Sequence, residues 1–131
     1  TKNNKIIINY KNNIKELNEA FNLNLKDNDN LEKLDLSEKG ISNIEILEKL
    51  EIYNLEELNL SWNLISDIKV LEKVKFYNLK ELNLADNEIS DIKLLENVKL
   101  INLEILYLNR NLISDIKVLV KVKFYNLKEY I

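Results

Sequence analysis

The chain has 131 residues, a formal net charge of -3, and neither cysteine nor histidine. This length suits one domain, and the acidic balance argues against a nucleic-acid partner. Without thiols or imidazoles the chain has no cysteine nucleophile, no histidine base and none of the commonest nitrogen or sulfur metal ligands, so we expect no cofactor, no metal site and no enzyme activity. No apolar run approaches the ~18 residues that a membrane span needs, so we expect no membrane partner.

Residues 1–29 share no pattern with the rest of the chain. Residues 6–10 favour a short strand or extended segment, and Asn13 is placed to cap a short helix over residues 14–22. We expect this segment to cover the open end of the repeats that follow, with a loop at residues 26–29. The covering side chains would be Ile14, Leu17, Phe21, Leu23 and Leu25. The alternative is a disordered leader.

The remaining residues, 30–131, are tandem copies with a period of 24. Residues 54–77 read NLEELNLSWNLISDIKVLEKVKFY, and close copies occupy 78–101 and 102–125. A looser copy precedes them at 30–53 and a fragment follows at 126–131, which makes about four repeats and a partial fifth. A fixed period in this range predicts a solenoid rather than a globule with a single core.

The first half of each repeat has the pattern L-x-x-L-x-L-x-x-N-x-I. The alternation around Leu58 and Leu60 has the period of a strand, so these leucines should point into the core while Asn59 points outward. Stacked copies would then pair as a parallel sheet. The asparagine that follows faces inward, where its amide can satisfy the backbone groups of a sharp turn. These asparagines are Asn63, Asn87 and Asn111, whereas the first repeat has Lys39 followed by Gly40.

The second half of each repeat reads I-S-D-I-K-x-L. Ser66, Ser90 and Ser114 are candidate helix N-caps, and apolar residues then recur at i, i+3 and i+6. This spacing predicts a helix of about two turns that packs against the sheet. The chain would return to the core at Ile52, Phe76, Leu100 and Phe124.

These motifs resemble the leucine-rich repeat, in particular the subclass of the protein phosphatase one regulator, internalin-like proteins and axonemal dynein light chain. The period of 24 differs from the 22 usual in that subclass, and the extra length lies around K-V-K-F-Y. The resemblance implies a right-handed α/β solenoid with a short parallel sheet on its concave side and short helices on its convex side. It also implies a scaffold that binds proteins through the concave face.

Aligning the copies identifies the side chains expected on that concave face. Four rows result, at repeat positions three, five, seven and eight: Lys33, Glu57, Glu81, Ile105 and Glu129; Asp35, Asn59, Asn83 and Tyr107; Ser37, Ser61, Ala85 and Asn109; Glu38, Trp62, Asp86 and Arg110. Aromatic residues and arginine are enriched at interface hot spots. We therefore predict a partner-binding patch made of Trp62, Asn83, Asp86, Ile105, Tyr107 and Arg110. The alternative is that Trp62 covers Leu64 or the asparagine row while Arg110 pairs with Asp86.

The concave side is also acidic. Nine acidic residues stand against four basic ones, a difference of five negative charges: Glu32, Asp35, Glu38, Glu56, Glu57, Glu81, Asp86, Glu104 and Glu129 against Lys33, Lys80, Arg110 and Lys128. One hypothesis is a basic partner that is steered to this face. The other is a solvated face that keeps the protein in solution.

The last strand, at residues 127–131, stops before its asparagine turn, and Val120 and Tyr130 depart from the other copies. We expect further chain, a partner or a second copy to cover this end. Taken together, the sequence predicts a cytoplasmic, non-catalytic module that binds a protein. The alternatives are a regulatory subunit of an enzyme such as a protein phosphatase, and a structural component that docks through its ends.

Overall fold

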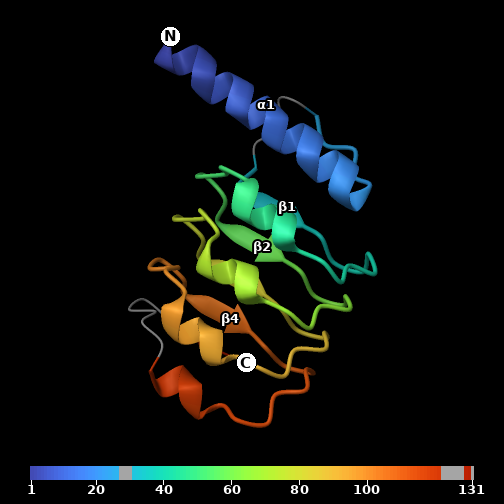
Figure 1. Ribbon diagram of the computed structural model, residues 1–131, viewed down its shortest axis with the longest axis vertical. Helices are drawn as coiled ribbons and strands as arrows, with labels where there is room; N and C mark the ends of the chain where they lie inside the picture. Colours follow the sequence, from blue (N-terminus) through green and yellow to red (C-terminus); the bar gives the residue numbers. More distant parts are fainter. Residues whose placement is uncertain (27–30, 122–128, 131) are drawn as a thin grey trace.

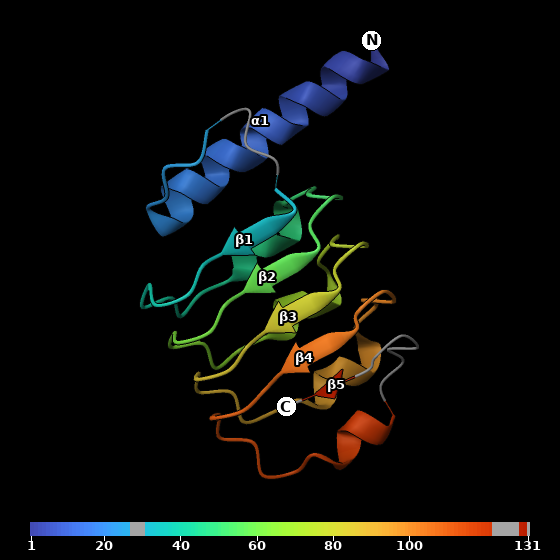
Figure 2. The same cartoon turned by 180° about the vertical axis from the view of Figure 1, so that it is seen from behind.

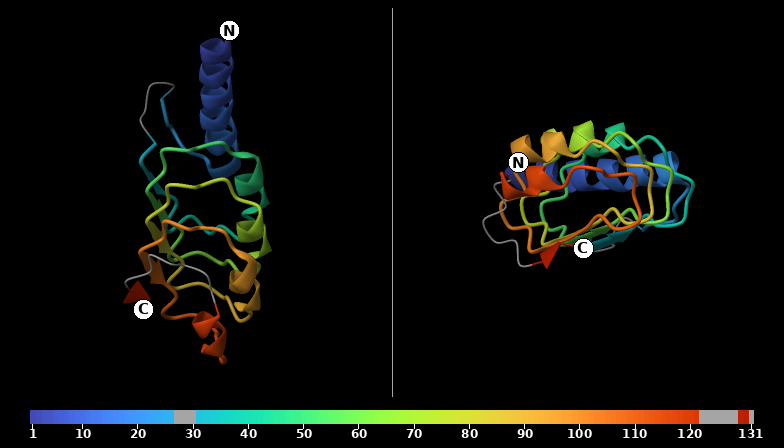
Figure 3. Two further views of the ribbon diagram at one scale, coloured as in Figure 1. Left: turned by 90° about the vertical axis from the view of Figure 1, so that its left-hand side faces the viewer. Right: turned by 90° about the horizontal axis from the view of Figure 1, so that it is seen from below.

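The computed structural model describes residues 1–26, 31–121 and 129–130, and within them it forms a stack of similar coils. Each coil contributes one short strand and one short helix, and the strands lie in one layer while the short helices lie in the opposite layer (Figures 1 and 3). The solenoid predicted from the period is therefore confirmed.

The sheet has five parallel strands in chain order, namely β1 (Lys33–Asp35), β2 (Glu57–Asn59), β3 (Glu81–Asn83), β4 (Ile105–Tyr107) and β5 (Glu129–Tyr130). Each residue pairs with its counterpart in the next repeat, so that Leu58 lies beside Leu82 and Leu82 beside Leu106 (Figure 2). These central leucines are buried while their strand neighbours are partly or fully exposed. This confirms the inward and outward assignments made from the alternation. The start of the last strand at residue 127 and the core position of Phe124 lie outside the described residues.

The asparagines form the predicted ladder, and each one joins its own turn to the preceding repeat. Asn87 Nδ2 donates to the carbonyls of Leu60 and Leu84 at 3.0 and 3.2 Å, and Asn87 Oδ1 accepts from the Ile65 N–H at 3.0 Å. Asn63 of the second repeat plays the same part toward the first repeat, because its Oδ1 accepts from Ile41 N–H at 3.0 Å. One amide thus supplies the partners that a buried turn would otherwise lack.

The convex helices are shorter than expected. They are 3-10 helices of four or five residues: η1 (Glu45–Lys49), η2 (Lys69–Glu72), η3 (Lys93–Asn97) and η4 (Lys117–Val120). The predicted serine caps are wrong, because the exposed serines make no cap bond and Asp67 Oδ1 instead accepts from Lys69 N–H at 2.9 Å. The apolar spacing of i, i+3 and i+6 is that of a 3-10 helix, in which side chains repeat every three residues.

The N-terminal segment forms one long helix, α1 (Lys2–Phe21), so the strand expected at residues 6–10 and the cap expected at Asn13 are both wrong. The helix begins one residue after Thr1, whose side chain accepts from Asn4 N–H, and it ends at Asn22 in a left-handed conformation. The β-branched residues near its start favour a strand by local propensity, which is a weak guide to the structure that a segment adopts. Asn13 instead joins α1 to the first repeat, donating to the Glu51 carbonyl at 3.0 Å and accepting from its N–H at 3.3 Å.

Side chains of this segment pack against the first repeat, and the covering role stays a prediction. Ile14, Leu17 and Phe21 are buried in the same cluster as the leucines of the first repeat, and Leu23 and Leu25 pack against that cluster. The helix lies across the end of the stack, next to β1 (Figure 1).

Candidate protein-binding surface

Three of the predicted site residues share the outer face of two neighbouring strands. The register places Asn83 of β3 opposite Tyr107 of β4, and Glu81 opposite Ile105. All four side chains are partly exposed, and adjacent strands lie about 4.8 Å apart. An aromatic ring, an aliphatic side chain and a carboxylate are therefore immediate neighbours on this face.

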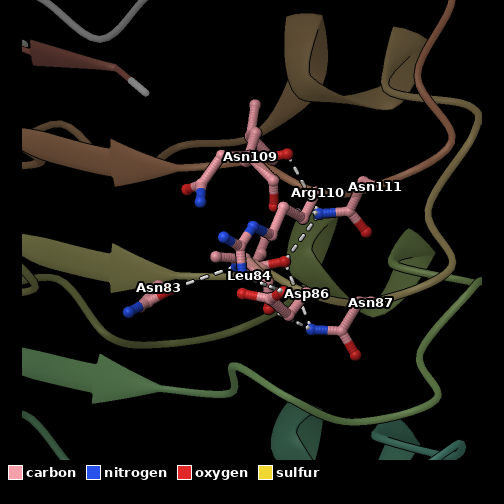
Figure 4. A network of polar contacts seen from close by, with 9 residues as sticks. Asn83, Leu84, Asp86, Asn87, Asn109, Arg110 and Asn111 are labelled. Atoms are coloured by element: carbon pink, nitrogen blue, oxygen red, sulfur yellow. Dashed lines mark hydrogen bonds and ion pairs between the residues drawn. The ribbon is translucent and has the colours of Figure 1, made fainter.

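Asp86 and Arg110 form the ion pair expected for them. Arg110 Nη1 lies 3.5 Å from Asp86 Oδ1, on the turns that follow β3 and β4 (Figure 4). Because the arginine is well exposed, the pair contributes about 0–1 kcal/mol to stability. Its outer position leaves the guanidinium accessible to a partner.

Trp62 lies on the turn after β2, two repeats away from Arg110, and is 55 % exposed. Its neighbour Leu64 is 52 % exposed, so the indole does not seal that leucine from water. The backbone of Trp62 is left-handed, with φ of 55°, as it is at the equivalent Glu38, Asp86 and Arg110. Sequence reasoning missed this geometry, because only Asp86 is of a type that commonly adopts it.

Two members of the row at position seven, Ser61 and Ala85, do not lie on the surface, which corrects the prediction for them, whereas Ser37 is partly exposed and Asn109 is exposed. Ser61 and Ala85 are buried, because the chain bends inward directly after the strand. Each bend is held by the residue two places earlier, since Asn59 Oδ1 accepts from Ser61 N–H and Asn83 Oδ1 from Ala85 N–H, both at 3.0 Å. Asn83 therefore has a structural role in addition to its place on the predicted patch.

The first repeat uses an aspartate for the same bend. The Ser37 hydroxyl and N–H donate to Asp35 Oδ1 at 2.6 and 2.9 Å. These two hydrogen bonds hold the pKa of Asp35 below its usual value. The pKa of Lys33, in the row at position three, is raised, because its ammonium group donates a hydrogen bond to Glu57 and lies near the negative charge of that carboxylate.

The described part of the sheet side keeps its net charge of five negative units, with eight acidic against three basic residues once Lys128 and Glu129 are left aside. Each of the three basic side chains has an acidic neighbour. Lys33 lies 3.1 Å from Glu57, Lys80 lies 3.2 Å from Glu56, and Arg110 pairs with Asp86. A hollow of about 260 Å³ lies over β1 to β3, lined by side chains that include Asp35, Glu57 and Glu81.

One surface feature was missed from the sequence. Tyr53 and Tyr77 are both about half exposed, and their rings stack with centroids 6.0 Å apart and planes 9° apart. Tyr53 ends the segment K-L-E-I-Y and Tyr77 ends K-V-K-F-Y, at the same position of the repeat, and each follows a buried residue, Ile52 or Phe76. The recurrence of tyrosine directly after a buried residue was the signal in the sequence that could have predicted this surface feature.

Within residues 1–26, 31–121 and 129–130, no group of three or more acidic side chains is arranged to hold a metal ion. The same residues contain no helix that combines the length and the apolar character of a membrane span.

Comparison with known proteins supports the interpretation of the 24-residue copies as leucine-rich repeats. A family model described as leucine-rich repeats in two copies matches residues 77–121. No curated protein matches the sequence.

The solved structures that are similar to this chain include two internalins and a further leucine-rich-repeat protein. Internalin C2 of Listeria monocytogenes is 30% identical with a TM-score of 0.63, and the match covers 88% of this chain and 44% of that one. A second Listeria monocytogenes internalin is 27% identical with a TM-score of 0.60, covering 90% of this chain and 41% of that one. A leucine-rich-repeat protein of Leptospira interrogans is 29% identical with a TM-score of 0.53, covering 69% and 24%. This chain thus spans less than half the length of the internalins that it matches.

Proposed function

Because this chain is a leucine-rich-repeat protein that resembles the internalins, we propose that it is a non-catalytic module that binds a basic segment of a partner protein on its concave sheet face. Repeat proteins of this kind offer an extended surface for protein binding, since each repeat adds one strand to the same face. The concave side, the basic partner and the cytoplasmic location are parts of this proposal. Cell fractionation tests the last of them.

The observation that carries the proposal is the charge of the sheet side. Five net negative charges lie on one side of a chain whose total is only -3. A field of one sign steers an oppositely charged partner toward the face and raises the association rate. Binding should therefore weaken as salt is added, because the Debye length falls to about 8 Å at physiological ionic strength.

The apolar exceptions on this face supply the anchors. Ile105 and Tyr107 stand where the other copies carry polar residues, and both are partly exposed. Tyrosine is enriched among the residues that carry most of the binding energy, whereas rim charges mainly set orientation and rate. We therefore expect a partner that places apolar side chains on β4 and basic ones over β2 and β3.

The test is a titration of the ¹⁵N-labelled protein followed by NMR. The probes are short peptides that share leucine and serine positions and differ only in having arginine, glutamine or glutamate at the remaining ones. The arginine peptide should shift the amides of Glu81, Asn83 and Tyr107. Tyr107→Ala should weaken its binding about tenfold or more, while Lys69→Ala in the convex layer is the matched control.

Equal shifts from all three peptides, or shifts confined to other surfaces, would contradict the basic partner. The same protein can be offered to an enzyme such as a protein phosphatase, whose activity would change if the module regulates it.

A second candidate is docking through the C-terminal end of the stack. Ile116 is 59 % exposed, whereas its counterparts Ile68 and Ile92 are 1 and 2 % exposed. Large exposed apolar patches are typical of contact surfaces. Ile116→Lys should abolish an assembly that forms through this end and leave binding at the sheet face unchanged, as measured by light scattering.

A further inference from the structure

A row of apolar side chains lies on the loops that return the chain from the short helices to the strands. We call it the return-loop ridge, and it consists of Tyr53, Tyr77 and Ile101 on the loops at residues 50–53, 73–77 and 98–101. These side chains are 47, 51 and 52 % exposed. The residue directly before each of them is buried, so the core does not require an apolar residue at the ridge. Folding alone therefore does not explain why an apolar side chain recurs at this exposed position of the repeat.

Contacts between neighbouring loops hold the ridge together. Tyr53 and Tyr77 stack on each other, and neighbouring loops are joined by side-chain bonds to the backbone. Asn78 Nδ2 donates to the Tyr53 carbonyl and Asn102 Nδ2 to the Tyr77 carbonyl, both at 2.6 Å. Stacking uses one face of each ring and leaves about half of each residue in water. A surface fixed in this way loses little conformational entropy when it binds.

The charge of these loops is opposite to that of the sheet side. The three loops contain Lys73, Lys75 and Lys99 against Glu51, a net of two positive charges. Lys75 lies 3.5 Å from Glu51, while Lys99 is exposed beside Ile101. The return loops lie along the edge of the stack where the strands begin (Figure 2), whereas Trp62 follows the end of β2.

We propose that the return-loop ridge is a second protein-docking surface, which takes an acidic segment with apolar side chains. The apolar side chains of that segment lie on Tyr53, Tyr77 and Ile101, and its carboxylates lie against Lys75 and Lys99. This goes beyond the sheet-face proposal, because the two surfaces have opposite charge and the ridge lies on the return loops rather than on the sheet face. One chain then joins an acidic and a basic partner segment.

The experiment uses the same peptide set and the same labelled protein. The glutamate peptide should shift amides of residues 73–77 and 98–101, and added salt should weaken this binding. Tyr77→Ser should weaken it about tenfold, and Lys99→Glu should weaken it further than the same change at Lys93, an exposed lysine of η3 that serves as the charge-matched control. Tyr107→Ser on the sheet face should leave it unchanged. The dispersion of each variant spectrum reports folding.

Three results overturn the ridge proposal. One is a glutamate peptide that does not bind or that shifts residues elsewhere, and another is unchanged binding in Tyr77→Ser. The third is binding of the ridge to vesicles of anionic phospholipid while the glutamate peptide has no effect. The arginine peptide remains an independent measure of the sheet face, so failure at one surface is distinguishable from failure at the other.

Discussion

A left-handed residue stands at the same place in every turn, under four different side chains. Glu38, Trp62, Asp86 and Arg110 share a φ of 54 to 56°, so the conformation belongs to the repeat and not to the residue. Such a backbone costs an ordinary L-residue roughly 1–2 kcal/mol, and asparagine or aspartate tolerates it best. Trp62 thus has a strained backbone and an exposed side chain, which favours a role in binding over a role in stability.

We expect Trp62→Asn to leave the protein as stable or to stabilise it by about 0.5–1 kcal/mol, because asparagine relieves the strain and little buried surface is lost. Urea unfolding gives the free energy, and Asp86→Asn serves as a control at an equivalent site. The same Trp62 variant should weaken binding at the sheet face. A loss of more than about 2 kcal/mol would mean that the indole packs into the fold.

The lowered pKa of Asp35 gives a prediction about acid stability. A carboxyl group whose pKa is lower in the folded state stabilises the fold above its unfolded pKa of about 3.9 and loses that contribution as the pH falls through the folded value. Asp35→Asn keeps an oxygen acceptor for Ser37, as Asn59 does for Ser61, but cannot titrate. Its stability should therefore fall less than that of the native chain between about pH 5 and 2. Parallel acid unfolding curves would disprove the link.

At the scale of elements, the sequence predicted what depends on local periodicity. The alternation around Leu58 and Leu60 predicted the strand, and Asn63 predicted the turn that follows it. Both signals are local in the sequence and recur from copy to copy. The length of α1 was not predictable in this way, since its buried face is defined only by the repeat on which it packs. The left-handed turn could not be predicted for a different reason, because tryptophan and arginine, the residues at positions 62 and 110, do not commonly adopt this conformation.

The asparagine ladder allows a graded test. Asn87→Ala removes the bonds to the carbonyls of Leu60 and Leu84 and to the N–H of Ile65. Each bond contributes about 1 kcal/mol and the backbone groups left behind are buried, so we expect a loss of roughly 3 kcal/mol. Asn111 makes the same kind of bonds but is only half-buried, so Asn111→Ala should cost less. Equal losses in thermal unfolding would show that burial does not set the strength of the ladder.

At the scale of the whole molecule, the surface is divided into two regions of opposite charge. The sheet side carries five net negative charges and the return loops two net positive ones, although each repeat supplies residues to both. This follows from the repeat itself, because a residue type fixed at one position in each copy becomes a row along the stack. A solenoid can therefore hold two surfaces of opposite character without a second domain.

The two ends of the stack differ, and this predicts a gradient of stability. At the N-terminal end Ile14 and Leu17 of α1 pack against the first repeat, while at η4 the side chain of Ile116 is exposed. The amides of Leu71 and Leu119 make equivalent bonds of 3.0 Å in η2 and η4, but Leu71 is buried and Leu119 is only half-buried. Because each repeat is stabilised mainly by its neighbours, hydrogen exchange should be slower at Leu71 than at Leu119.

Leu17→Ala tests the other end of this gradient. It should cost about 2–5 kcal/mol and speed exchange in the first repeat more than in the third, because the helix seals only the repeat that it touches. Ala20, on the exposed side of α1, offers Ala20→Ser as a control that should leave exchange in the repeats unchanged. If Leu17→Ala instead accelerates every amide equally, the stack unfolds as one unit, and the difference between Leu71 and Leu119 should vanish with it.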